Sequence, residues 1–164
     1  ERVSSVMAVI GPNASGKTAL LKPVLFLVWF VCHSFSIEPS AHLPLNPHAA
    51  SSIEPSEFEL EFDFEGRLWR YTLRCTQQRV LHEALYVKHD RMRYVFVREW
   101  RDDTQSYDVK QQDFGFSPTE AKKVRPNASL IATAAQYGVP LAQPFVVKPS
   151  SRTPVAGSGK LGPR

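Results

Sequence analysis

Gly11-Pro12-Asn13-Ala14-Ser15-Gly16-Lys17-Thr18 is a complete phosphate-binding loop of the form G-x-x-x-x-G-K-T. The apolar residues 6–10 precede this loop, and a long apolar segment, residues 19–32, follows it. Strand, loop and helix in this order are the context that the motif requires. The two glycines let successive backbone N–H groups point at phosphates, and the following helix adds the positive end of its dipole. The sequence therefore predicts binding of a nucleoside triphosphate.

Residue types within the loop indicate separate roles. Lys17 is placed to contact the β- and γ-phosphates as a point charge, and the Thr18 hydroxyl is placed to complete the oxygen shell of a magnesium ion. We predict Lys17 as the catalytic residue and Thr18 as the metal ligand. The predicted nucleotide-binding residues are Gly11, Pro12, Asn13, Ala14, Ser15, Gly16, Lys17 and Thr18. A chance match in a glycine turn is the alternative, and the flanking strand and helix patterns count against it.

Length and charge limit the classes of protein to consider. The chain has 164 residues, of which 43% are hydrophobic, and this is enough for one core. The net charge is +4 and the pI is near 9.2, with one moderate concentration of arginines. Its members are Arg67, Arg70, Arg74 and Arg79. We interpret them as the solvated face of a sheet, and contact with nucleic acid is the alternative.

The cysteines and the apolar segment after the loop indicate the cellular compartment and whether the chain crosses a membrane. Cys32 and Cys75 lie far apart and belong to no paired-cysteine motif, so the sequence shows neither a zinc signature nor a disulfide framework and favours a reduced, cytoplasmic setting. The segment 19–32 is short and contains Lys22 and Pro23, which favours a bent core helix over a membrane span. Because apolar residues occupy nearly every side of this helix, its outer side needs a further layer of protein.

The middle of the chain predicts an antiparallel meander. Residues 34–56 read as a loop, and then Phe58, Leu60, Phe62 and Phe64 alternate with acidic residues. Glu65-Gly66 predicts a hairpin turn, and the returning strand carries Arg70 and Arg74 opposite those acids. Two more strands are expected, over residues 80–87 and 94–100. We interpret the outward carboxylates Glu57, Glu59 and Glu61 as solvated charge, with metal binding as the alternative.

The remaining sequence predicts one helix and a tail. Residues 127–137 are small and apolar, which is typical of a helix, whereas residues 148–164 are rich in Pro, Gly, Ser and basic residues and are predicted to be disordered. The predicted organisation is a nucleotide-binding domain over residues 1–147, with a β-subdomain at about 57–100, and a basic tail over 148–164.

Two motifs of phosphate-loop proteins are missing from the chain. The base-reading motif Asn-Lys-x-Asp of GTPases does not occur, because the three asparagines, Asn13, Asn46 and Asn127, all stand in other contexts. ATP-hydrolysing members need an apolar strand that ends in an aspartate, which holds magnesium and polarises water. None of the aspartates ends such a strand: Asp63, Asp90, Asp102, Asp103, Asp108 and Asp113.

The phosphate loop followed by Ala-Leu-Leu-Lys resembles the ATP-binding proteins of the AAA/ABC-like group related to SMC (structural-maintenance-of-chromosomes) and OLD (overcoming-lysogenization-defect) ATPases. Residues 54–62 and 79–86 are similar to the antiparallel β-subdomain that follows the loop in bacterial proteins of this group. Residues 127–130 and 134–136 also resemble it, so the resemblance covers roughly residues 5–146.

This resemblance implies a fold class, cofactors and partners. The fold is α/β, a partial P-loop NTPase core with an antiparallel β-subdomain of the ABC/SMC type. The resemblance implies ATP and Mg²⁺ as cofactors. For the intact protein it implies hydrolysis at a homodimer interface, in DNA maintenance or phage defence, with a nuclease or toxin as a candidate partner. Because the later motifs of the group have no counterpart, we expect the chain to be the N-terminal portion of a longer protein. The alternative is a nucleotide-binding fragment or interaction module without turnover.

Overall fold

The computed structural model describes residues 17–45 and 54–146. In chain order, the elements are α1 (Lys17–His33), η1 (Ser34–Ser36), β1 (Ser56–Phe64), β2 (Arg67–Cys75), β3 (Val80–Lys88), β4 (Met92–Arg101), β5 (Ser106–Gln111), α2 (Pro118–Lys122), α3 (Leu130–Gln136) and η2 (Gln143–Phe145). The predicted strand at residues 6–10 and the predicted tail at 148–164 lie outside the described residues.

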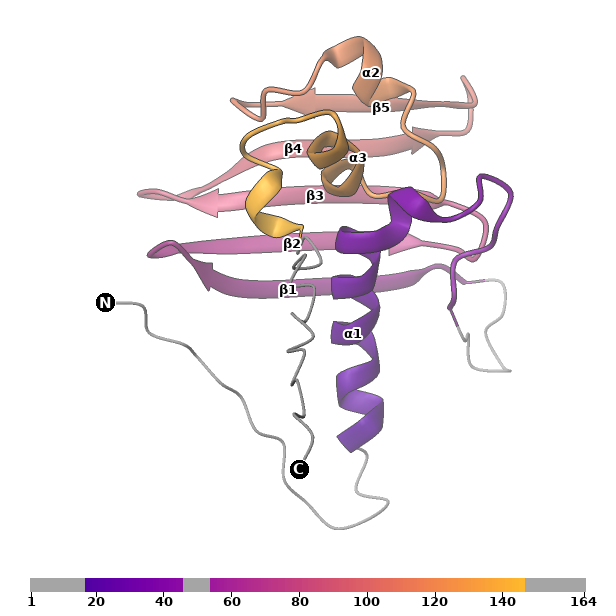
Figure 1. The fold of residues 1–164 in the computed structure, drawn as a ribbon, viewed down its shortest axis with the longest axis horizontal. Helices are drawn as coiled ribbons and strands as arrows, with labels where there is room; N and C mark the ends of the chain where they lie inside the picture. Colours follow the sequence, from indigo (N-terminus) through magenta and orange to yellow (C-terminus); the bar gives the residue numbers. More distant parts are fainter. Residues whose placement is uncertain (1–16, 46–53, 147–164) are drawn as a thin grey trace, which may run out of the picture.

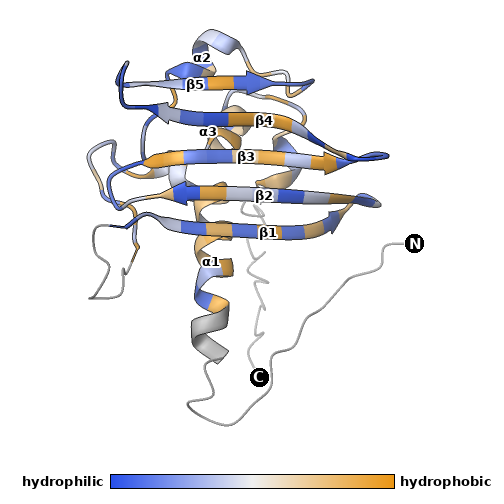
Figure 2. Cartoon of the chain, turned by 180° about the vertical axis from the view of Figure 1, so that it is seen from behind, coloured by the Kyte–Doolittle hydropathy of each residue, from blue (hydrophilic) through white to orange (hydrophobic). Residues whose placement is uncertain are grey.

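The five strands form one antiparallel meander in the order β1-β2-β3-β4-β5. The helices lie on one face of this sheet in Figure 1, and the opposite face, seen in Figure 2, has the strands in front. The described part is therefore a two-layer α/β arrangement, in which each layer buries the apolar side of the other. The antiparallel meander expected from the alternating sequence pattern is confirmed.

The first hairpin follows directly from its sequence. Glu65 and Gly66 form the turn with φ values of 52° and 73°, the left-handed geometry of a tight two-residue hairpin loop. Arg70 of β2 lies opposite Glu61 of β1, with 2.6 Å between Nη2 and Oε1, and 3.5 Å separates its Nε from the Glu59 carboxylate. The expected attraction between the acidic and basic outer faces is confirmed. These ion pairs are solvent-exposed, so they add little to stability.

The segment after residue 101, for which no strand was predicted, contains one. A fifth strand, β5, pairs with β4 and extends the meander, and the short helix α2 begins at Pro118, a residue that suits a first helical position. In β5, Tyr107 and Val109 belong to the core side. The helix expected over 127–137 is present but shorter. It begins after Ser129, whose side chain accepts hydrogen bonds from the N–H groups of Ile131 and Ala132.

The hydrophobic core lies between the inner face of the sheet and the helical layer. Leu73, Leu85 and Phe96 from three neighbouring strands are fully buried. α3 lies over them with six of its seven residues buried, which makes it the central helix of the layer.

α1 contacts this core with only one half of its length. Leu27 and Phe30 are buried, and the Phe26 ring lies 5.0 Å from the Phe58 ring of β1. In Figures 1 and 2 the amino-terminal half projects past the edge strand β1. Leu21 and Leu25 on this half keep 40% and 65% of their surface exposed. The expectation that α1 needs a further layer of protein on its outer side agrees with this exposure.

The residues described contain no helix whose length and apolar character would suffice to cross a membrane. α1 continues through Pro23, so the proline does not end the helix.

Candidate nucleotide-binding site

Lys17 and Thr18, the last two residues of the predicted phosphate loop, are the first two residues of α1. The other six loop residues, Gly11 to Gly16, lie outside the described residues. The backbone therefore places Lys17 and Thr18 at the first two positions of a helix. This is the position at which the N–H groups of a first helical turn are free to bind phosphate.

The start of α1 is suited to an anionic ligand. The helix has 17 residues, and its first turn contains no acidic residue. Its dipole places about half a positive charge at the amino-terminal end, and no carboxylate in that turn opposes this charge. The amino-terminal end of α1 is therefore electrostatically suited to an anionic group.

The opposite end of α1 is held by a segment that is distant in sequence, residues 124–129, which we name the clamp segment. Arg125 donates from Nη1 to the carbonyl of Ile37 at 2.9 Å and from Nη2 to the carbonyl of Phe35. The Ser129 N–H donates to Ser34 Oγ at 2.8 Å. Asn127 Nδ2 contacts the carbonyls of residues 38, 39 and 41 at 2.9 to 3.2 Å.

A buried carboxylate, Glu83, joins the clamp segment to the sheet. It is 0% exposed and accepts hydrogen bonds from Tyr71 Oη at 2.9 Å, Ser129 Oγ at 2.7 Å and the Leu130 N–H at 2.9 Å. Burial and, after it, the neighbouring Glu83 raise the pKa of Tyr71 well above its usual value. Tyr71 therefore keeps its proton and remains a donor to the carboxylate.

Arg98 is the cationic partner of Glu83 and is also 0% exposed. Its Nη1 lies 3.4 Å from Glu83 Oε2 and donates to the carbonyl of Ala128 at 2.8 Å. Its Nη2 donates to the carbonyls of Val124 and Arg125 at 2.8 and 2.9 Å. The guanidinium carbon lies 3.8 Å from the centre of the Tyr107 ring. One arginine thus holds three carbonyls of the clamp segment against the sheet.

An apolar cavity of about 260 Å³ separates part of α1 from the sheet. Leu27 and Val31 line it from α1, and Leu60 and Phe62 line it from β1. Cys32 also borders the cavity. The second cysteine, Cys75, is fully buried, and burial followed by the nearby Glu83 charge raises its thiol pKa to about 12.

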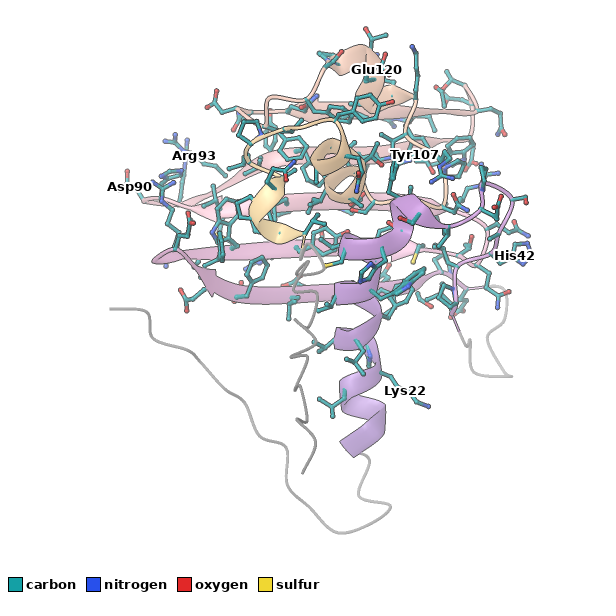
Figure 3. All side chains as sticks on the ribbon, in the orientation of Figure 1. Lys22, His42, Asp90, Arg93, Tyr107 and Glu120 are labelled. Atoms are coloured by element: carbon teal, nitrogen blue, oxygen red, sulfur yellow. The ribbon has the colours of Figure 1, made fainter. Side chains whose placement is uncertain are left out.

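The outer face of the sheet carries part of the charge predicted for it, because Glu59, Glu61 and Arg70 pair there, whereas Arg79 lies between β2 and β3. Within residues 17–45 and 54–146, no group of three or more His, Cys, Asp or Glu side chains has the arrangement of a metal site. Two of the four clustered arginines have partners, because Arg70 pairs with Glu61 and Arg79 lies over the Trp100 ring at 4.2 Å. Figure 3 shows charged side chains, including Asp90 and Arg93, at one end of the sheet.

Sequence reasoning gave no role to Glu83 or Arg98. Both side chains lie on the inner face of the sheet, on the neighbouring strands β3 and β4, and the two residues are direct cross-strand partners. A charged residue at an inward position of a strand is itself a signal, because a buried charge requires a partner. Glu83 shares the inner face of β3 with Leu85 and Val87. Arg98 shares the inner face of β4 with Phe96. Two such positions on adjacent strands therefore indicate a buried ion pair.

Comparison with known proteins identifies a family. The family described as "AAA domain, putative AbiEii toxin, Type IV TA system" matches residues 6–134. This range includes the phosphate loop, α1, all five strands of the meander and most of α3. No match was found among curated proteins or among solved structures. Because the match spans most of the chain, this protein belongs to that AAA-domain family.

Proposed function

We propose that this chain binds ATP together with magnesium through residues 11–18. The observation that carries the proposal is the start of α1 at Lys17, directly after the glycine-bracketed loop and without an acidic residue in the first turn. Membership of the AAA-domain family supports a nucleotide-binding ATPase domain. Gly11 and Gly16 would let the loop backbone approach the phosphates, and Lys17 would contact the terminal phosphate oxygens.

Magnesium, when bound, neutralises charge on the β- and γ-phosphates, and the Thr18 hydroxyl is the oxygen that this chain would contribute to it. We expect Thr18→Ala to weaken ATP binding about tenfold in the presence of magnesium and to leave binding in EDTA unchanged, because only a metal ligand is lost. Titrations with and without magnesium measure this effect. Thr104→Ala, in an exposed turn, is the matched control. An equal loss under both conditions would refute the role given to Thr18.

We propose that hydrolysis requires groups supplied outside the described residues of this chain. In the described part all strands are antiparallel, so no aspartate stands at the carboxyl end of a parallel strand beside the loop. Activation of water by an acid and completion of the site by a second subunit each contribute several kcal/mol to phosphoryl transfer.

We therefore expect residues 1–164 alone to turn over ATP no faster than a Lys17→Ala control, as measured by phosphate release. About 1.4 kcal/mol of lost transition-state stabilisation lowers the rate tenfold, so the loss of both contributions would lower it by several orders of magnitude. Robust turnover that depends on Lys17 would show that a catalytic acid is present in this chain. Binding without turnover also fits the alternative of a nucleotide-binding interaction module.

For the biological role we propose the setting implied by the resemblance to SMC and OLD ATPases, namely DNA maintenance or phage defence. A homodimer with ATP at its interface and a partner nuclease or toxin fit this role. The family description supports the defence setting, because it refers to a toxin of a type IV TA system. Analytical ultracentrifugation with and without Mg-ATP tests the dimer, which should form only when nucleotide is present.

A further inference from the structure

We infer that the clamp segment, residues 124–129, fixes the direction of α1 relative to the β-meander and thereby positions Lys17 and Thr18. Arg125 is the main positioning residue of this device. The consequence for nucleotide binding rests on the function proposed above, whereas the geometric part does not.

Apolar packing alone leaves the direction of α1 weakly determined. The buried contacts of the helix come from its carboxyl-terminal half, such as Leu27, Phe30 and the Phe26–Phe58 ring pair. A cavity of about 260 Å³ lies beside these contacts, so the helix and the sheet are not closely packed along their whole interface. Apolar contacts are non-directional, and a helix resting beside a cavity has room to pivot.

Polar contacts at the carboxyl end of α1 are directional and numerous. Arg125 donates to the carbonyls of Phe35 and Ile37, which follow the end of the helix. The adjacent Ser129 N–H and Asn127 amide bind Ser34 and the chain after it. A cation at a helix carboxyl end is also favoured by the helix dipole. Together these bonds fix both the place and the direction in which the helix ends.

The clamp segment is itself held from the opposite side by the sheet. Arg98 donates to the carbonyls of Val124, Arg125 and Ala128, and Glu83 accepts from Ser129. Both charged side chains are 0% exposed, so water does not compete for these bonds. A continuous chain of hydrogen bonds therefore runs from β3 and β4 through the clamp segment to the end of α1.

The length of α1 amplifies any pivot at this end. With 17 residues the helix is about 25 Å long, so a rotation of about 10° moves its first residue by about 4 Å. Misplacement of a site group by about 1 Å can cost a factor of about 100 in a reaction that depends on alignment. The anchor at Arg125 thus controls a site at the far end of the helix. Figure 3 labels Lys22, which lies on the projecting part of this lever.

The test measures the direction of α1 without nucleotide. Nitroxide labels are attached at Lys22→Cys on α1 and Lys110→Cys on β5, both exposed positions, in a Cys32→Ser background. Cys75 stays unlabelled because it is buried and its thiol pKa is about 12. Pulsed electron paramagnetic resonance gives the distribution of distances between the labels. We expect Arg125→Met to shift or broaden the distribution by several ångströms and Arg125→Lys to have an intermediate effect, since one ammonium cannot replace the guanidinium fork.

Lys123→Met is the matched control, because Lys123 is exposed and pairs only with Glu120 at 3.1 Å among the described residues. It should leave the distribution unchanged. If Arg125→Met does not fold, Arg125→Lys carries the test, as it keeps the charge. An unchanged distance distribution in the folded Arg125 variant would overturn the inference.

ATP affinity, measured on the same proteins, separates this inference from the proposed function. If the parent binds ATP, Arg125→Met should bind at least about tenfold more weakly while Lys123→Met binds like the parent. A broadened distribution with parental affinity would refute the coupling to the nucleotide. A broadened distribution in a chain whose parent does not bind ATP would refute the proposed function and leave the positioning of α1 established.

Discussion

Glu83→Ala is expected to lower the free energy of unfolding by about 3–5 kcal/mol, because it leaves the buried guanidinium of Arg98 without its carboxylate. The substitution also removes the acceptor of Tyr71 Oη, Ser129 Oγ and the Leu130 N–H. These unsatisfied donors are part of that cost, since a buried donor without an acceptor costs about 1–3 kcal/mol. Since the total stability of a domain is about 5–15 kcal/mol, this single change should bring the protein close to unfolding.

Urea denaturation followed by tryptophan fluorescence measures this loss. Glu99→Ala is the matched control on the next strand, because the Glu99 carboxylate is 43% exposed and pairs with His82 at 2.9 Å. The control should cost less than about 1 kcal/mol. Glu83→Gln keeps an acceptor oxygen but loses the charge, so its loss in the free energy of unfolding should lie between those of Glu83→Ala and Glu99→Ala. If the alanine variant does not fold, the glutamine variant is compared with Glu99→Ala in its place. Equal losses at Glu83 and Glu99 would be incompatible with the buried ion pair.

Local patterns in the sequence were sufficient for much of the fold. The turn at Glu65-Gly66 was predictable because glycine with a preceding polar residue favours the left-handed hairpin geometry, and the strict alternation from Phe58 to Phe64 sets the face of β1. The start of a helix after Gly16 was predictable from the loop motif. In each case neighbouring residues in the chain determine the structure.

The strand β5 was missed for a physical reason. It has only six residues, and its outward positions are polar, so it resembles a connection in composition. Its alternating Tyr107 and Val109 were the available signal. Arg125 illustrates a different limit. The carbonyls that it binds belong to residues 35 and 37, and no local pattern predicts a contact between segments so distant in sequence.

Lys17→Ala is expected to weaken ATP binding at least about 100-fold, corresponding to about 2.8 kcal/mol, because hydrogen bonds from a charged donor to phosphate are lost. Stability should change little, since alanine has the highest helix propensity and position 17 is the first residue of α1. Thermal unfolding followed by circular dichroism checks that the variant remains folded. Lys22→Ala, on the same helix, is the control and should keep the affinity of the parent.

Calorimetric titration of Mg-ATP into the parent, Lys17→Ala and Lys22→Ala proteins tests the nucleotide-binding assignment most directly. We predict saturable binding with one site per chain in the parent and in Lys22→Ala, and an affinity at least about 100-fold weaker in Lys17→Ala. No binding by the folded parent, or equal affinity in the parent and Lys17→Ala, would contradict the assignment of residues 11–18 as the nucleotide site.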